Sequence, residues 1–360
     1  MLSDLDSLLD SILDTVILAS DNTSSDNILD TDLITLIELP EAEADPRLKL
    51  LSHSSRTTLH KCPRKYQLYR LSSEEVELSE AATTNQAVTF AYGHAVGTGI
   101  QSSLEELEDK STEQIILDVF LAWDTDLLAE NPKQKKSFWT ALSAVLKFSS
   151  LRSRGLLADY KLVYHNGKPA VELSFEVILP NNYRYRGFVD AVLVHKVTGE
   201  VLVLEAKTTS GQANSASYKN SGQALGYSVI LDILFPAMSS YTVLYIVQET
   251  GSGNYVEMPF TKSLLQRALW LQELLIDTQL VELYHSYGTF PTHGESCFDF
   301  FRPCEYLGIC NLPTSNLTKP LTNKIMDKIS ASTYDFTISF EDLVSAQIAK
   351  GKLFSSSPSS

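Results

Sequence analysis

The sequence is poor in cysteine, with four among 360 residues, and it has no apolar run as long as the roughly 18 residues that a membrane span requires. No internal repeat is visible. The N-terminus carries Asp4 and Asp6 and lacks the basic segment of a signal peptide, so we expect a cytoplasmic protein with no membrane partner. The length suffices for one large domain or two small ones with a sizeable core.

Basic residues are absent from residues 1–46, which hold 12 of the 44 acidic residues. The rest of the chain holds all 29 basic residues and the other 32 acidic ones, so its formal charge is −3 although the whole chain carries −15. Its basic residues gather in segment 56–70 and again between residues 133 and 154. Such groups are typical either of solvated helix faces or of surfaces that contact a phosphate backbone, and charge alone leaves both open.

Composition and periodicity divide the chain into three parts. Residues 1–48 are acidic and rich in Ser and Asp, which predicts a disordered leader; the helical spacing of its apolar residues also allows a short amphipathic helix. Residues 49–312 carry the periodic segments of a folded domain. Residues 313–360 form a C-terminal extension whose Ser-rich end we expect to be disordered.

The folded part changes between helical and strand periods, which indicates an α/β protein. Helices are expected at residues 56–70, 87–108, 111–129, 134–154, 214–235 and 261–286. Strands are expected at residues 161–165, 170–180, 184–195, 200–209, 241–250 and 254–260. Asn-Gly at 166–167 and Thr-Gly at 198–199 predict two hairpin turns.

Charged residues interrupt the apolar hairpin formed by residues 184–209. If Thr-Gly at 198–199 is a two-residue turn, Asp190 lies opposite Lys207, and Glu205 points to the same face. Two carboxylates at the edge of an apolar core are costly unless a cation pairs with them. Mg²⁺ suits this position because it takes carboxylate oxygens, water and phosphate. The alternative is a buried Asp190–Lys207 bridge with Glu205 in solvent.

Asp190, the Glu-Ala-Lys of residues 205–207 and the QALGY stretch at 223–227 together resemble the RecB-like branch of the PD-(D/E)XK nucleases. The resemblance implies a restriction-endonuclease-like mixed β-sheet flanked by helices, with a helical N-terminal portion. It implies that Asp190 and Glu205 bind Mg²⁺ or Mn²⁺ and that Lys207 is catalytic. It also implies that Gln223 and Tyr227 line the site. From spacing alone these two are neighbours on one helix face, and a core tyrosine with a satisfied amide is the alternative.

The resemblance extends upstream to the segment FAYGHAVGTGIQSSLEEL at residues 90–107. The family often has Gly-x-x-x-His there, with the histidine as a metal ligand. In this chain the residue four after Gly93 is Gly97, so His94 is the tentative substitute. Gln101 could serve instead, or the site could lack this ligand. Glu172 resembles a glutamate that often precedes the metal-binding aspartate and is a secondary candidate.

The four cysteines are Cys62 and a late C-x6-C-x5-C trio, Cys297, Cys304 and Cys310. Four thiolates suit a [4Fe–4S] cluster or a tetrahedral Zn²⁺ site, and disulfides are less expected without a secretion signal. One early cysteine and a late trio resemble the iron–sulfur branch of RecB-like nucleases, which includes AddB and the CRISPR-associated and phage-encoded exonucleases. There the cluster lobe joins the two ends of the nuclease core. The usual trio begins C-x2-C, which would need a cysteine at position 301, three residues before Cys304; Phe301 stands there, and Cys297 appears instead. Zn²⁺ and free thiols remain the alternatives.

The resemblance implies a metal-dependent DNA exonuclease that processes DNA ends in recombination, repair or phage DNA metabolism. DNA is then the substrate, and a helicase, an annealing protein or a single-strand-binding protein is a possible partner. For a phage-encoded protein the expected location is the host cytoplasm. A protein that keeps the nuclease fold but only binds DNA, or acts as a scaffold, is the alternative, and the absence of the family histidine favours it.

Overall fold

The computed structural model describes residues 44–71, 80–105, 110–124, 127, 135–236, 239–299, 302–316 and 334–355. The predicted leader lies outside these residues except for positions 44–48, and the Ser-rich end from position 356 onward lies outside as well.

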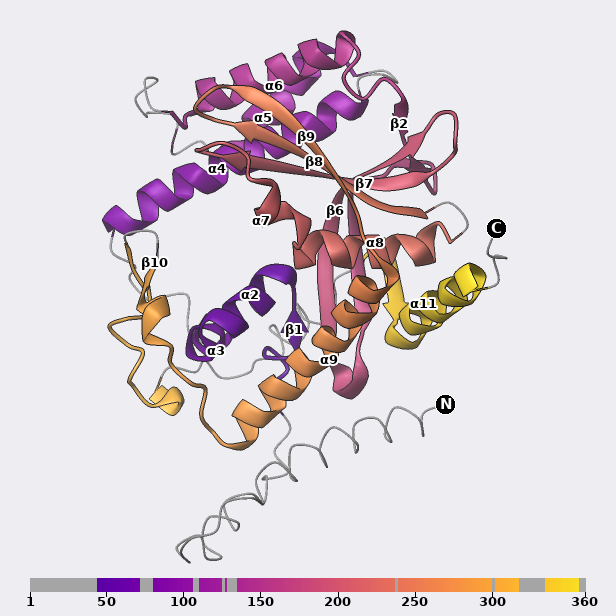
Figure 1. The fold of residues 1–360 in the computed structure, drawn as a ribbon. Coiled ribbons are helices and arrows are strands. Elements are labelled where there is room, and N and C mark those ends of the chain that lie inside the picture. The colour runs from indigo at the N-terminus through magenta and orange to yellow at the C-terminus, as the bar shows by residue number, and fades with distance from the viewer. Residues whose placement is uncertain are drawn as a thin grey trace, which may run out of the picture. The chain divides into compact units, whose positions relative to one another are not determined.

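The described helices (Figure 1) are α2 (His53–Lys61), α3 (Pro63–Leu71), α4 (Glu80–Glu105), α5 (Thr112–Ala122), α6 (Phe138–Ser153), α7 (Ser215–Lys219), α8 (Gly222–Leu234), α9 (Leu264–Ser286) and α11 (Phe340–Ser355). The described strands are β1 (Leu50–Leu51), β2 (Tyr160–Leu162), β3 (Tyr164–His165), β4 (Lys168–Pro169), β5 (Val171–Ile178), β6 (Arg184–His195), β7 (Val201–Thr209), β8 (Ser239–Glu249), β9 (Asn254–Thr261), β10 (Phe298–Asp299), β11 (Arg302–Pro303) and β12 (Phe336–Ser339).

One mixed sheet forms the centre of the described part of the chain. Its strand order is β12-β5-β6-β7-β8-β9, and β1 and β2 also pair with β6. The β12–β5 and β7–β8 pairs are parallel, whereas the β5–β6, β6–β7 and β8–β9 pairs are antiparallel. The α/β fold with a central mixed sheet is therefore confirmed.

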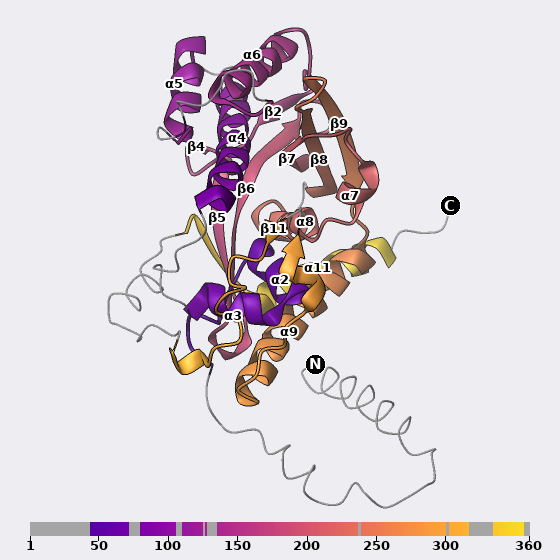
Figure 2. The ribbon, with the colours of Figure 1, turned by 90° about the vertical axis from the view of Figure 1, so that its left-hand side faces the viewer.

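Helices cover both faces of this sheet, as two perpendicular views show (Figures 1 and 2). On one face α4 contacts β2, β6 and β7 and packs against α5 and α6. On the other face α8 contacts β7 and β8, and α9 and α11 pack on α8. Strands β6 and β7 therefore run between two helical layers, which explains why their sequences are apolar on both faces.

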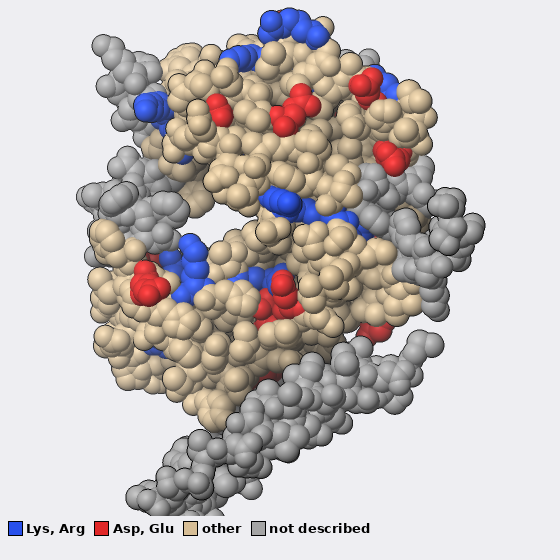
Figure 3. Space-filling view, viewed as in Figure 1, with Lys and Arg blue, Asp and Glu red and all other residues tan. Residues whose placement is uncertain are grey.

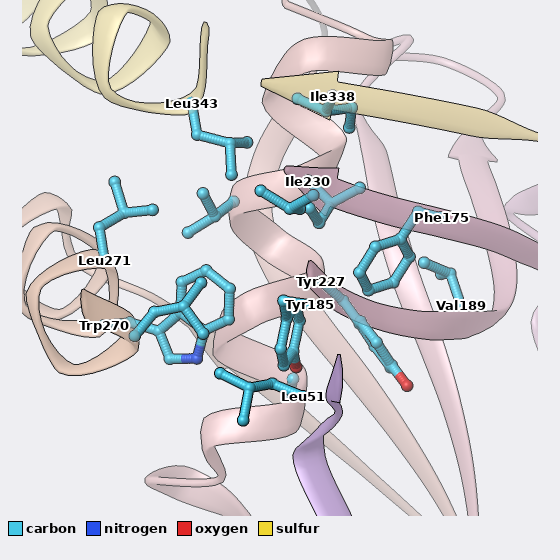
Figure 4. Close-up of a cluster of buried hydrophobic side chains, with 14 of the residues drawn as sticks. Leu51, Phe175, Tyr185, Val189, Tyr227, Ile230, Trp270, Leu271, Ile338 and Leu343 are labelled. Atoms are coloured by element: carbon cyan, nitrogen blue, oxygen red, sulfur yellow. The ribbon is translucent and has the colours of Figure 1, made fainter. Parts of the chain in front are cut away.

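The larger core lies on the α8 side of the sheet (Figure 4). Tyr227 and Ile230 of α8 meet Trp270 of α9 there, next to Phe175 of β5. Ile338 of β12 and Leu343 of α11 complete the same cluster. The C-terminal segment from residue 334 thus packs on the helix that carries the QALGY stretch.

Two of the expected helices are split. The helix expected at 56–70 breaks at Cys62, whose backbone is extended, and α3 begins with Pro63. A residue before proline avoids the helical conformation, and proline suits the first helical turn. The helix expected at 214–235 divides into α7 and α8 around Asn220 and Ser221, which cap the two helix ends. Strands β1 and β12 were not expected, because each is short and pairs only with distant residues.

Candidate active site

Asp190 on β6 and Glu205 on β7 are neighbours across an antiparallel strand pair. The pair includes Ala191–Leu204 and Val192–Val203, and extending this register by one residue places Asp190 opposite Glu205. The backbone N–H of Ala206 donates to Asp190 Oδ2 at 3.0 Å. The two carboxylates are therefore side by side.

This register differs by two residues from the one expected for a two-residue turn. His195 pairs with Glu200 instead, because its N–H donates to the Glu200 carbonyl at 2.8 Å and its ring Nδ1 accepts from the N–H groups of Val197 and Thr198. The turn is thus longer by two residues. A shift of two residues keeps every side chain on its face, so the expectation that Asp190, Glu205 and Lys207 share a face is unaffected.

The strand alternation of β6 breaks at Asp190. Val189 and Val192 belong to the same apolar cluster on the α8 side, although residues three apart on a regular strand point to opposite faces. On the adjacent strand Glu172 adopts φ +50°, a left-handed conformation that is unusual for a residue with a side chain. The sheet is therefore irregular at the carboxylates, as strained backbone often is near functional sites.

Glu205 is fully buried, yet its carboxylate is poorly satisfied. Lys207 Nζ lies 2.5 Å from Glu205 Oε1, but Glu205 Oε2 receives no hydrogen bond from the described residues. A buried polar atom without a hydrogen bond is costly. A cation held between Asp190 and Glu205 would satisfy this oxygen, so the donor set fits a divalent metal ion.

A chain of contacts links Glu205 to α8. The Lys207 ammonium donates to Gln223 Oε1 at 3.1 Å, and Gln223 Nε2 donates to the Tyr227 hydroxyl at 2.8 Å. Gln223 and Tyr227 are one helical turn apart, which brings both to the same face of α8. The structure thus brings together Asp190 and the motif residues of β7 and α8, namely Glu205, Lys207, Gln223 and Tyr227.

The electrostatics of the site are dominated by burial. Burial raises the pKa of Asp190 well above its usual range, and the Glu205 carboxylate raises it further. Burial likewise raises the pKa of Glu205, although Lys207 opposes this change. For Lys207 burial alone would lower the pKa, but the two carboxylates outweigh it and the pKa rises. When all three groups are ionised, the negative charges exceed the positive one, and the site attracts a cation.

His94 is exposed and lines an open pocket of about 350 Å³ with Gln101, Lys110 and Asp118. None of the described hydrogen bonds or ion pairs joins it to Asp190 or Glu205. Gln101 is linked to the carboxylates through Glu172: it is buried and donates to Glu172 Oε1 at 2.5 Å, and Glu172 raises the pKa of both Asp190 and Glu205.

Two residues near Lys207 carried no recognisable sequence signal. His53 begins α2, and burial, together with Lys207 and Arg56, lowers its pKa to about 4. Burial raises the pKa of Tyr218 on α7, and Lys207 partly offsets this rise. Both elements reach Lys207 only through the tertiary fold, so no spacing in the sequence could have indicated them.

Most basic side chains of segment 56–70 are engaged by other groups of the protein. Arg56 pairs with Asp277, and Lys65 pairs with Glu305. Arg70 donates to a backbone carbonyl of β1. This segment is therefore largely structural. Lys and Arg side chains lie beside an opening between the part of the molecule that contains α4 and the part that contains α2 (Figure 3).

The four cysteines lie in the region where α2 and α3 meet the segment 291–312. Cys62 separates the two helices, and the β10–β11 hairpin brings Cys304 to Cys297, whose carbonyl accepts from the Cys304 N–H at 2.8 Å. Burial raises the pKa of Cys310, and the thiolates of the other three cysteines raise it further, whereas Arg64 lowers it. Each of these sulfurs is therefore within electrostatic reach of Cys310.

The described residues contain no group of three or more His, Cys, Asp or Glu side chains already arranged to hold a metal ion. Mg²⁺ does not require one, since it is commonly bound by one or two carboxylates, waters and substrate phosphates. Four cysteine thiols are suitable ligands for a metal ion, but the described cysteine side chains are not arranged around a common metal position. No described helix combines the length and the apolar composition needed to cross a bilayer.

The family model for the PD-(D/E)XK nuclease superfamily matches residues 50–311. The chain belongs to this superfamily. PD-(D/E)XK nucleases generally use divalent metal ions such as Mg²⁺. The match includes Asp190, Glu205 and Lys207 as well as the four cysteines, and it ends before β12 and α11.

Comparison with solved structures gives distant likenesses. A candidate exonuclease from Eubacterium rectale has a TM-score of 0.40 and 10% sequence identity, and the match covers 80% of this chain and 95% of that one. The protein SSO0001 has a TM-score of 0.25 and 15% identity, with 63% of this chain and 85% of that one covered. No curated protein matches the chain. The assignment to the PD-(D/E)XK superfamily therefore depends on the family match.

Proposed function

We propose that this PD-(D/E)XK nuclease is a metal-dependent DNA exonuclease that processes DNA ends in recombination, repair or phage DNA metabolism. The observation that carries the proposal is the Asp190–Glu205 pair, in which Glu205 is fully buried, Lys207 Nζ lies 2.5 Å from its Oε1, and its Oε2 receives no hydrogen bond from the described residues. The ion pair with Lys207 leaves Oε2 of this buried carboxylate unsatisfied, whereas a divalent metal ion between Asp190 and Glu205 would coordinate it.

In this proposal Asp190 and Glu205 hold Mg²⁺ or Mn²⁺. When bound, the ion polarises the scissile phosphate and lowers the pKa of water. Lys207 orients the attacking water or stabilises charge that develops on the phosphate. Gln223 fixes the Lys207 ammonium through its 3.1 Å hydrogen bond, and Tyr227 fixes the Gln223 amide in turn. These two residues position the lysine.

Because the family histidine is missing, a third protein ligand of the metal ion, besides Asp190 and Glu205, has to come from another residue. Between the two candidates, the contact of the buried Gln101 with Glu172 at 2.5 Å favours Gln101 over the exposed His94. Glu172 is then the residue that orients Gln101 toward the carboxylates.

We further propose that Cys62, Cys297, Cys304 and Cys310 bind a [4Fe–4S] cluster, with Zn²⁺ as the alternative, and that the chain belongs to the RecB-like iron–sulfur branch. The support is that Cys62, near the start of the matched residues 50–311, lies in the same region of the fold as the three cysteines near their end. Such a link would close a loop of 235 residues between Cys62 and Cys297, and closing a long loop removes conformational entropy from the unfolded chain. The cysteine lobe, by which we mean Cys62 and the segment 291–312, would then stabilise the fold and take no part in cleavage.

The test is cleavage of end-labelled linear DNA by anaerobically purified protein with Mg²⁺ or Mn²⁺. We expect the wild-type protein to degrade the DNA, Lys207→Ala to be inactive, and chelation of the metal to stop the reaction. The order in which label is released gives the polarity. Cleavage by Lys207→Ala at the wild-type rate would contradict the assigned site. Iron analysis and visible absorbance of the same preparation distinguish an iron–sulfur cluster from Zn²⁺.

A second candidate function is DNA binding without cleavage, either as a DNA-binding protein or as a scaffold, and Gly97 at the family's histidine position favours it. A wild-type protein that binds DNA but does not cleave it with either Mg²⁺ or Mn²⁺ would support this function. A cytoplasmic location, and a helicase, annealing or single-strand-binding partner, follow from the exonuclease proposal and stay predictions.

A further inference from the structure

His53 lies at the lysine end of the proposed active site. Strand β1 runs parallel to β6 with Leu51 next to Tyr185, and α2 starts two residues later with His53. The His53 ring carbon Cε1 lies 4.0 Å from the position that a Cβ on Gly222 would take. Gly222 directly precedes Gln223, whose amide holds Lys207. The imidazole therefore sits beside the residues that fix the lysine.

The surroundings of His53 keep its ring uncharged. Burial lowers the pKa to about 4, and Lys207 and Arg56 contribute in the same direction. A neutral imidazole offers one N–H donor and one acceptor nitrogen. The described hydrogen bonds include one from Thr57 to the His53 backbone carbonyl and none to its ring. Both ring nitrogens are thus available to a ligand.

A phosphate placed next to Lys207 is the ligand this arrangement suits. Lys207 already supplies positive charge, so a neighbouring group need only donate a hydrogen bond, and the imidazole does so without adding a third cation beside Lys207 and Arg56. His60, at the other end of α2, contrasts with His53 because its Nε2 is engaged by Asp277 at 2.7 Å.

We propose that His53 is a substrate-contacting residue whose imidazole N–H donates to a non-bridging oxygen of the phosphate bound beside Lys207. The inference depends on the proposed nuclease function for its substrate. It assigns to α2 a contact with the scissile strand that neither the family match nor the sequence motifs indicate.

The kinetic test compares His53→Ala, His53→Gln and the control His60→Gln on linear DNA with Mg²⁺. Loss of one hydrogen bond to a charged group predicts a fall of about 10- to 100-fold in kcat/KM for His53→Ala. His53→Gln should recover part of the rate because its amide N–H can donate. His60→Gln should lower the melting temperature, since Asp277 loses a partner, yet keep kcat within about twofold.

A second readout does not depend on cleavage. Protein labelled with ¹⁵N-histidine is titrated with a 5′-phosphorylated oligothymidylate in the presence of a chelator, and the His53 ring nitrogens are followed by NMR. We expect them to shift on addition of the oligonucleotide and the His60 nitrogens not to shift.

Wild-type activity of His53→Ala would overturn the inference, and so would an equal loss of activity in His53→Ala and His60→Gln that parallels their melting temperatures. If the wild-type protein cleaves no DNA, the proposed nuclease function fails, and the NMR titration alone decides whether His53 contacts phosphate. Unchanged His53 nitrogens in that case would overturn the inference as well.

Discussion

Asp190 and Glu205 illustrate how the site costs stability. Burial raises the pKa of each carboxylate, and each of the two charges disfavours the other. Lys207 compensates only in part, because one ammonium faces two carboxylates. A metal ion would supply the missing positive charge. Without it the ionised pair destabilises the fold, which is a common trade-off between stability and activity.

We predict that Asp190→Asn is more stable than the wild-type protein at pH 7 in a chelator, because the variant removes a carboxylate whose ionisation is disfavoured by burial and by the Glu205 charge. The pKa of Asp190 is raised on folding, so its contribution to stability is greatest below its unfolded pKa and declines as the pH rises through the folded pKa. The advantage of the variant should therefore shrink towards pH 4. Thermal melts at several pH values measure it.

Mg²⁺ provides the control for this prediction. It should raise the melting temperature of the wild-type protein and affect Asp190→Asn much less, because the variant lacks one of the two carboxylates. An Asp190→Asn protein that is less stable than wild type at pH 7 in chelator would contradict the proposed electrostatic cost.

At the scale of elements, the position of α8 depends on its close crossing with α9. A Cβ added at Gly226 would lie 2.5 Å from Cζ2 of Trp270, which is far inside van der Waals contact. The glycine thus lets the two helices approach. Since Gln223 and Tyr227 lie on the same helix, this crossing also sets where the partners of Lys207 stand.

Gly226→Ala should lower the free energy of unfolding by about 1–3 kcal/mol, the usual cost of overpacking, and should lower nuclease activity by displacing Gln223. Chemical denaturation measures the first effect. Gly222→Ala is the matched control, because the nearest atom to its Cβ is 4.0 Å away and alanine is the better helix former. The double variant Gly226→Ala/Trp270→Phe should lose less unfolding free energy than the sum of the losses in the two single variants. Equal stability of the two alanine variants would contradict this account.

At the scale of the whole molecule, the cysteine lobe joins residues that are far apart in the chain. Arg64 donates to the Cys310 carbonyl at 3.0 Å and to the Leu312 carbonyl at 2.6 Å. Ser296 donates to the Lys61 carbonyl at 2.7 Å. These bonds attach the segment 291–312 to α2 and α3 without a metal. A cluster would add to an attachment that already exists.

Cys304→Ser should therefore reduce the cluster content and the melting temperature more than it reduces the rate of cleavage per folded molecule. Ser296→Ala is the control: it removes one hydrogen bond of the same lobe, costing about 1 kcal/mol, and should leave the cluster content unchanged. Iron analysis, thermal melts and the DNA cleavage assay measure the three quantities. Identical melting of Cys304→Ser and wild type would rule out a stabilising cluster.

Local patterns in the sequence determined much of this protein. Period-two runs predicted β6 at its observed bounds and β7 within one residue, and indicated that Asp190, Glu205 and Lys207 lie close together. This succeeded because side-chain alternation is a property of the strand itself. The order of the motifs was also enough to indicate the superfamily to which the chain belongs.

Tertiary structure decided the remaining features. It set the register of β6 and β7, since His195 closes a turn that is two residues longer than expected. It engaged most basic side chains of segment 56–70 with other groups of the protein, added β12 to the sheet, and placed His53 beside Lys207. Each of these depends on contacts between residues far apart in the chain. Periodicity and spacing describe only neighbours, so the sequence determined the kind of site, and the fold decided which residues complete it.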